Sequence, residues 1–513
     1  MQNISVDKNV INKAILFVII FFVGYSVVLS WSFLFQNVDD AYISFRYGKN
    51  MMSGDGLVYN KGEYVEGYTN FLWTVVTAPF TKIESIDISI FATSFGIIFS
   101  VINLLLLSFI SRQFTESFPR YSTYLFLLPS LLIALDNTMA FWAIGGMEFP
   151  IYIFFILGII YNYFRLNDSP KHTSYLIIFL ILCTLTRPEG NMIFVITLFH
   201  MMLFRKRLNE FKPVVIKIIL SYVLFCAAYY GFKYFYYGQI LPNTFYAKGV
   251  TDLSMNLILG VKYVIMCIGF RIYILIFIFF IPFREAFRNF RLSYLILFSF
   301  IYVSYIIGVG GDWMYANRFF VPIIPILYLL SVVGLIYFIK KITEYFSNKK
   351  TFSELKLRNR FRIFVICLCV ALFSISLSNL EYKRLILEED NANFERQWSR
   401  FGQWLKINCP QNTIIAVGPA GKIPYYSELY TVDMWGLNDE HISRLKSTRL
   451  QAGHKKFDFE YVLSRKPEFI IGYAGFTDNN IPANFEKFNS PEDYYKCMDI
   501  VFRLKKDFRE LNK

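Results

Sequence analysis

The sequence is poor in charged residues. Only 18% of its 513 residues are Asp, Glu, Lys or Arg, whereas soluble proteins average about a quarter. Hydrophobic residues make up 55% of the chain. These proportions exclude a string of soluble domains and predict one α-helical polytopic membrane protein. The chain also contains 56 Phe and 36 Tyr, which excludes disorder.

Histidine and cysteine are scarce as well. The four His residues are scattered, at positions 172, 200, 441 and 454, so a zinc site is not expected. Seven Cys in 513 residues exclude a small disulfide scaffold. Five of them lie in apolar stretches, where they are expected to pack; Cys409 and Cys497 could pair in an oxidising compartment. The chain shows no internal repeat.

Long apolar stretches recur along the chain. A membrane span needs roughly 20 mostly apolar residues, and about eleven stretches are candidates, of which the fifth and sixth are short and could form one broken hairpin. They cover 13–35, 86–110, 121–136, 138–164, 173–186, 190–204, 214–236, 256–282, 292–309, 319–340 and 361–378. The first is expected to be a retained anchor. The stretch 71–80 is too short to cross, so it predicts an interfacial or re-entrant helix.

The Lys and Arg residues predict the orientation of these spans. One set of alternate loops carries 21 Lys and Arg residues and the opposite set carries 6. Basic loops stay on the cytoplasmic side, so the N-terminus is predicted to be cytoplasmic. The protein itself is predicted to lie in the inner or plasma membrane. Most of the net charge of +14 is thereby explained by topology and contact with anionic lipid heads. It therefore requires no nucleic-acid partner.

The composition changes near residue 380. Residues 380–513 carry 20 Lys and Arg against 19 Asp and Glu. Strand-like runs at 413–417 and 469–471 and a helical pattern at 388–407 predict a compact α/β domain, which an odd number of spans places outside the cell. The predicted domains are therefore a membrane domain, 1–379, and an extracytoplasmic domain, 380–513.

Two adjacent carboxylates, Asp39 and Asp40, open the first outer loop. The residues after them have helical spacing, with Ile43, Tyr47 and Met51 on one face, and end at an SGDG turn. The pair is therefore predicted to begin an amphipathic helix at the membrane surface. One Asp suffices to cap a helix, so a catalytic role is predicted for at least one of the two.

The other outer loops supply further acids and isolated bases beside the bilayer. An Arg next to an acid at a helix break is either a local ion pair or a phosphate ligand, and an isolated interfacial Lys either snorkels or binds. The polar residues singled out in these loops and span ends are Glu66, Glu148, Arg187, Asn243, Tyr246, Lys248, Asp312 and Arg318. Together they would suit a substrate that is part lipid, part phosphate and part polar head.

Six strings in order resemble one family. They are DDAYISFRYGKN…GEYVEGYTNFLW, GGMEF, LTRPEG, LPNTFYAKG, GGDWM…RFFVP and GPAGKIPYYS…VDMWGLND. The chain thereby resembles the bacterial GT-C-type membrane glycosyltransferases related to the terminal β-(1→2)-arabinofuranosyltransferase of mycobacteria. The resemblance implies a GT-C-like fold and transfer of a sugar, such as arabinofuranose, from a polyprenyl-phosphate donor to a cell-envelope glycan.

The resemblance also implies roles for particular residues. It makes Asp40 and Asp39 the catalytic site, one of them as the general base. We expect the eight polar residues above to bind the donor, with Arg187, Lys248 and Arg318 near the phosphate. Acceptor binding is predicted for an aromatic and amide set in the outer domain: Tyr425, Tyr426, Trp435, Asn438 and Asp439.

Several alternatives stay open at this point. No cofactor is required, but a divalent cation (Mg²⁺, Mn²⁺ or Ca²⁺) could be held by Asp and phosphate oxygens. The stereochemistry and the oligomeric state are open. A related transferase could modify O-antigen, lipid A or protein. From other classes, a flippase for lipid-linked sugars and a non-catalytic envelope assembly protein are the rivals.

Overall fold

A computed structural model gives the structure of the protein. It describes residues 16, 20, 24, 37–83, 85–115, 125–248, 253–312, 314, 316–347, 389–446, 456–472, 481–488 and 501–505. Apart from three single positions in the first, the predicted spans 13–35 and 361–378 lie outside the described residues. The predicted domain boundary at 379/380 and Cys497 lie outside them too.

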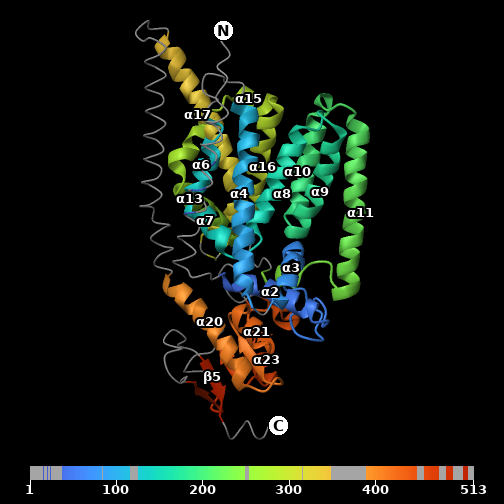
Figure 1. Ribbon diagram of the computed structural model, residues 1–513, viewed down its shortest axis with the longest axis vertical. Helices are drawn as coiled ribbons and strands as arrows, with labels where there is room; N and C mark the ends of the chain where they lie inside the picture. The colour runs from blue at the N-terminus through green and yellow to red at the C-terminus, as the bar shows by residue number, and fades with distance from the viewer. Residues whose placement is uncertain are drawn as a thin grey trace.

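Helices form the larger part of the described chain, as Figure 1 shows. Their apolar composition explains this arrangement, because a helix satisfies all of its backbone groups internally. The helices of the bundle are α4 Ile88–Thr115, α6 Leu128–Ala134, α7 Asn137–Ile144, α8 Phe149–Phe164, α9 Pro170–Thr186, α10 Gly190–Leu203, α11 Phe211–Tyr237, α13 Leu253–Gly269, α14 Ile272–Leu275, η3 Ile276–Phe280, α15 Phe283–Arg288, α16 Phe290–Val309, η4 Arg318–Ile323 and α17 Ile324–Ser347.

Within the described residues, four helices are long and apolar enough to cross a membrane, or up to six if each bent pair is one span. One bent pair is α7 with α8, which meet at 115°. Helices α9 and α10 have 17 and 14 residues, or about 26 and 21 Å at about 1.5 Å per residue. Each is shorter than a bilayer core of about 30 Å. A multi-pass membrane protein is confirmed, while the count of eleven spans stays a prediction.

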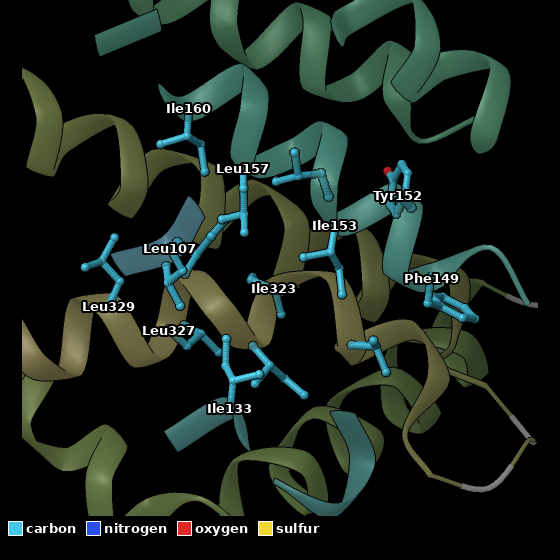
Figure 2. Packing of buried hydrophobic residues seen from close by; sticks show 14 of the residues in the cluster. Leu107, Ile133, Phe149, Tyr152, Ile153, Leu157, Ile160, Ile323, Leu327 and Leu329 are labelled. Atoms are coloured by element: carbon cyan, nitrogen blue, oxygen red, sulfur yellow. The ribbon is translucent and has the colours of Figure 1, made fainter. Parts of the chain in front are cut away.

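The core of the bundle forms around α17. This helix is buried along most of its apolar length, and Figure 2 shows its side chains among those of α4 and α8. Ile323 of η4 and Leu327 of α17 lie near Leu107 of α4 and Leu157 of α8 in that view. Close packing of this kind fixes the helix ends, which is where the polar residues stand.

The first outer loop folds as expected from its spacing. Helix α2, Asp39–Met52, begins at the Asp pair and ends before the SGDG turn, where Gly54 and Gly56 take positive φ angles. The apolar stretch 71–80 forms the short helix α3, Phe71–Thr77, and the first residues of the 3₁₀ helix η1, Ala78–Lys82. Both predictions of helix are confirmed.

The C-terminal region contains the predicted α/β domain, hereafter the outer domain, a name taken from the side of the membrane that the sequence predicts for it. Its five-stranded sheet has the order β2-β1-β3-β5-β4, in which β1 pairs in parallel with β2 and β3, and β5 is antiparallel to β3 and β4. The elements are α20 Glu389–Asn408, β1 Ile414–Val417, α21 Lys422–Ser427, β2 Tyr430–Asp433, α22 Glu440–Arg444, α23 Phe459–Ser464, β3 Phe469–Ile471, β4 Phe485–Lys487 and β5 Val501–Leu504. Helix α20 and strands β1 and β3 fall where the sequence predicts them.

The outer domain lies at one end of the bundle, against α2 (Figure 1). The apolar face of α2 carries Ile43, Tyr47 and Met51, and it joins one hydrophobic cluster with Phe401 and Leu405 of α20. The amphipathic helix is therefore covered by protein on this face. The first outer loop is the junction between the two parts of the molecule.

Candidate functional site

A cavity of about 580 Å³ lies where α2 meets the ends of the membrane helices. Most of its lining is apolar, but seven charged side chains reach it. They are the acids Asp40, Glu148, Glu189 and Asp312 and the bases Arg187, Lys248 and Arg318. Six of the seven stand among the residues singled out from the sequence, although they come from five separate parts of the chain. A buried, mostly apolar cavity with a few convergent charges is the usual form of a ligand site.

Arg318 joins two acids at one side of the cavity. Its Nε and Nη2 donate to the two oxygens of Asp312, at 2.6 and 3.0 Å, and its Nη1 donates to Oδ2 of Asp40 at 2.7 Å. Asp312 and Arg318 are almost fully buried, whereas 24% of the Asp40 side chain is exposed. Opposite charges favour the ionised form of each partner. The Asp40 carboxylate is thus held by one cation and open to the cavity.

Backbone geometry explains how Asp312 and Arg318 reach this position. Gly310 and Gly311 end α16 with φ angles of +86° and +72°, a conformation that glycine adopts without steric cost. Ala316 and Asn317, directly before Arg318, also have positive φ angles, near +50°. Each non-glycine residue of this kind costs about 1–2 kcal/mol. The strain lies beside the site, where such outliers concentrate.

Arg187 makes a second clamp between acids that line the cavity. Its Nη1 donates to Glu148 at 2.5 Å, and its Nε and Nη2 donate to the two oxygens of Glu189 at 3.2 and 2.9 Å. The sequence left open whether Arg187 is an ion-pair partner or a phosphate ligand. The ion pair with Glu189 is present, and Glu148, which lies 39 positions away in the sequence, is a second partner. A role in donor binding stays a prediction.

Removing Arg187 should destabilise the fold. Arg187→Ala leaves Glu148 and Glu189 buried without their cation, and breaking a buried ion pair in this way costs about 3–5 kcal/mol. We expect a lower thermal midpoint of the detergent-solubilised protein. Arg187→Lys, which keeps the charge, should lose less than Arg187→Ala. Equal midpoints for wild type and Arg187→Ala would contradict the clamp.

Lys248 differs from the two arginines because its ammonium has no partner among the described residues. It follows α12, Asn243–Ala247, and lines the cavity. Its Nζ forms no hydrogen bond or ion pair with any residue that the structure describes. Burial lowers the pKa of Lys248, and the nearby Arg318 lowers that pKa further, while Asp312 and Asp40 oppose the shift. A buried ammonium with unused donors is suited to an incoming anion.

Asp39 turns away from the cavity although it neighbours Asp40. Its two carboxylate oxygens accept from the backbone N–H groups of Gly421, at 2.9 Å, and Lys422, at 2.7 Å. Both residues belong to the outer domain, where Gly421 directly precedes α21 and Lys422 is the first residue of that helix. The structure therefore separates the predicted catalytic pair: Asp40 lines the cavity and Asp39 contacts the outer domain.

Three other predicted donor ligands do not line the cavity. Glu66 is buried with Lys233, whose Nζ lies 2.9 Å from Oε2, and burial raises the pKa of Glu66 to about 7 against the opposing effect of that cation. Asn243 points at the outer domain. The ring of Tyr246 is stacked under the guanidinium of Arg444 at 3.4 Å. These side chains surround the site without facing it.

The predicted acceptor residues also lie outside the cavity lining. Tyr425 is buried, with its ring centroid 5.3 Å from that of Tyr42 in α2. The Tyr426 hydroxyl donates to Asp87 at 2.5 Å. The backbone N–H of Trp435 donates to Asp433 at 3.0 Å. Their contacts with an acceptor stay a prediction.

Asn438 and Asp439 hold the loop after β2. The backbone N–H and side-chain amide of Asn438 both donate to Asp433, at 2.8 and 2.9 Å, and burial raises the pKa of Asp433 to about 6. Asp439 caps α22 by accepting from the N–H of Ile442 and also accepts from the hydroxyl of Tyr461. Through these hydrogen bonds, Asn438 and Asp439 hold parts of the outer domain together.

Sequence reasoning missed several residues that complete the cavity. Asn70 donates to Glu148 at 2.7 Å, and the hydroxyl of Tyr305 donates to Glu189 at 3.1 Å. Asn70 and Glu189 stand inside the strings GYTNFLW and LTRPEG, so those strings carried the signal. Leu437 lines the cavity from the outer domain and stands inside the string VDMWGLND.

The described residues contain no group of three or more His, Cys, Asp or Glu side chains that could hold a metal ion. The acids of the cavity are instead paired with arginines. A divalent cation held jointly with the phosphate of a substrate stays a prediction.

Comparison with known proteins gives the fold. Residues 387–507 match a family described as Domain of unknown function (DUF8728). No curated protein matches the chain. Among solved structures, the oligosaccharyltransferase of Archaeoglobus fulgidus in the apo form is similar, with 11% identity and a TM-score of 0.54 over 82% of this chain and 64% of that one. The chain thus spans less than two thirds of that enzyme's length.

Two further structures are similar. The oligosaccharyltransferase AglB of Archaeoglobus fulgidus, in complex with an inhibitory peptide and a dolichol-phosphate, has 11% identity and a TM-score of 0.53, over 88% of this chain and 69% of that one. ArnT from Cupriavidus metallidurans bound to undecaprenyl phosphate has 12% identity and a TM-score of 0.49, over 81% and 85%.

The oligosaccharyltransferase similarities show the fold of this chain. It is the fold of the GT-C membrane glycosyltransferases, so the resemblance seen in the sequence is confirmed at that level. The narrower kinship with arabinofuranosyltransferases stays a prediction.

Proposed function

We propose that the chain is an integral-membrane glycosyltransferase that takes a sugar from a polyprenyl-phosphate donor. The observation that carries this proposal is that one cavity contains both an accessible carboxylate and a cation without a partner among the described residues. Asp40 is the most exposed of the four acids, at 24% against 1–8% for the other three. Lys248 is the cation without a described partner. The GT-C fold supports the same conclusion.

The chemistry of the transfer assigns Asp40 as the general base. The oxygen of an acceptor hydroxyl attacks the anomeric carbon, and its proton passes to the Asp40 carboxylate. The bond between the anomeric carbon and the phosphate oxygen breaks, and its electron pair leaves with the polyprenyl phosphate. A phosphate of this kind is a good leaving group without a general acid, but its developing charge needs cations or hydrogen-bond donors.

In our proposal, the ammonium of Lys248 is the cation that stabilises the leaving phosphate. Its three N–H donors are uncommitted to the described residues, whereas Arg187 and Arg318 each hold two carboxylates. A donor phosphate next to Lys248 would also be within reach of Arg318, because both side chains line the same cavity. An ammonium and a guanidinium together make a strong phosphate site.

We also propose the finer assignments that the sequence suggests. The donor sugar is a pentofuranose such as arabinofuranose, the acceptor is a cell-envelope glycan, and the cavity faces the extracytoplasmic side. The motif resemblance supports the sugar. The bias of Lys and Arg toward one set of loops supports the orientation.

A donor panel tests the function. Purified full-length protein is incubated with polyprenyl-phosphate derivatives of several pentofuranoses and hexoses, and transfer or hydrolysis is followed by the release of polyprenyl phosphate. We expect one donor class to be consumed, and the pentofuranose donors to be preferred. Equal consumption of a hexose donor would retire the pentofuranose assignment. No consumption of any donor, with or without Mg²⁺, Mn²⁺ or Ca²⁺ and an acceptor glycan, would refute the transferase.

A further inference from the structure

Two contacts join the outer domain to the two sides of the cavity. In the first, Asp39 accepts from the backbone N–H groups of Gly421 and Lys422. A Cβ atom added at Gly421 would lie 1.8 Å from the carbonyl oxygen of Asp39, so only glycine permits this approach. We call this contact the Asp39 latch. The next residue along α2 is Asp40.

The second contact involves Asn243, which begins α12. Its Nδ2 donates to the carbonyl oxygens of Gly436, Leu437 and Asp439, at 3.0, 3.1 and 3.1 Å, and its Oδ1 accepts from the Ser443 hydroxyl at 2.7 Å. The side chain is buried. We call this contact the Asn243 latch.

The Asn243 latch bears directly on Lys248. Helix α12 has five residues, which is far too short to be stable by its own hydrogen bonds. The Asn243 latch fixes its first residue, and the backbone N–H of Lys248 closes its last turn on Thr244 at 3.0 Å. The Asn243 latch therefore helps to position Lys248, together with Lys456, whose Nζ donates to the carbonyl oxygen of Tyr246 at 2.8 Å.

We infer that the outer domain sets the geometry of the cavity through these two latches, Asp39 placing Asp40 and Asn243 placing Lys248. The roles of Asp40 and Lys248 rest on the proposed function, whereas the contacts themselves do not. Asp39 and Asn243 are positioning residues in this view, since neither lines the cavity. A displacement of about 1 Å at a reacting group can reduce the rate by about 100-fold, so two such latches can decide activity.

The two latches predict different kinetic defects. Asp39→Ala should lower kcat about tenfold or more while the KM for the donor stays within twofold, because Asp40 shifts and Lys248 does not. Asn243→Ala should raise the KM for the donor about tenfold, because Lys248 shifts. A merely structural role would reduce the active fraction, so kcat would fall in both variants with KM unchanged. That result, or wild-type kinetics in both variants, would overturn the inference.

A graded series and a matched control sharpen the test. Asp39→Asn keeps one oxygen that can accept from the two N–H groups, so its kcat should lie between those of wild type and Asp39→Ala. Gly421→Ala should reproduce the defect of Asp39→Ala from the other side of the contact. The control is Glu428→Gln, which removes the ion pair of Glu428 with Lys49. This pair also joins α2 to the outer domain but holds neither latch, so kcat and KM should stay within twofold.

Hydrogen exchange of the full-length protein tests the two latches without an activity assay, because it measures the protection of the backbone amides. The amides at the start of α2 should exchange faster in Asp39→Ala, and those of α12 in Asn243→Ala, each without the other effect. If wild-type protein transfers no sugar from any donor, the proposed function fails while this measurement still decides the latches. Unchanged protection of both segments would overturn them.

Discussion

Replacing Asp40 with Asn should reduce sugar transfer by about 1,000-fold, within the range of about 10²–10⁴ that a general base contributes. Asn has the same size as Asp, and its oxygen can still accept from Nη1 of Arg318, which lies 2.7 Å from the carboxylate. The contact therefore persists, but the side chain cannot take a proton from the acceptor. The measurement is kcat and the donor KM with the donor that the panel identifies.

The control for this variant is another acid of the same loop. Asp55 pairs with Lys61 at 3.0 Å, and its partner is largely exposed; neither residue lines the cavity. Asp55→Asn should keep wild-type kinetics. The donor KM of Asp40→Asn should stay within a few-fold of wild type, because Lys248 is retained. Wild-type turnover in Asp40→Asn would refute the assignment of the base.

Replacing Lys248 with Met should raise the donor KM by about 100-fold. A hydrogen bond to a charged group contributes about 1.5–3 kcal/mol, and the upper part of that range corresponds to about two orders of magnitude. Met preserves most of the apolar length of the side chain and removes its charge. Lys248→Arg keeps a cation in the same place, so its donor KM should rise far less. Unchanged donor KM in Lys248→Met would contradict the phosphate role.

The lowered pKa of Lys248 adds a pH dependence with a definite sign. Burial disfavours the charged ammonium, so the proton is lost at a pH below the ordinary value for Lys, about 10.4. Donor affinity should be constant below the lowered pKa and fall as pH rises through it. The donor KM of Lys248→Arg should stay flat over the same alkaline range, because Arg remains charged. An equal alkaline rise in both proteins would exclude Lys248 as the titrating group.

The candidate site was predictable from the sequence in part. Asp40, Arg187, Lys248 and Arg318 were found because a charged residue at the end of an apolar stretch is expensive and stands out. Their partners could not be found in the same way. Arg318 meets Asp40 across 278 positions of sequence, and no local pattern encodes a contact of that separation.

The predicted acceptor residues of the outer domain show where composition is ambiguous. Tyr425, Asn438 and Asp439 have a composition typical of sugar sites. In the structure, Tyr425 packs against Tyr42 of α2, and the side chains of Asn438 and Asp439 bond to Asp433 and to the backbone N–H of Ile442. Aromatic and amide side chains serve equally well in packing and in capping. Composition alone does not distinguish these uses.

The sequence by itself determined the membrane class, helix α2 and the strands β1 and β3 of the outer domain, because hydropathy and periodicity are local properties of the chain. Only the tertiary structure decided between Asp39 and Asp40. Neighbouring residues of an α-helix lie about 100° apart around its axis, since a turn takes about 3.6 residues, so the two carboxylates cannot face the same way. Because the outer domain docks against α2, Asp39 bonds to its backbone, whereas Asp40 lines the cavity.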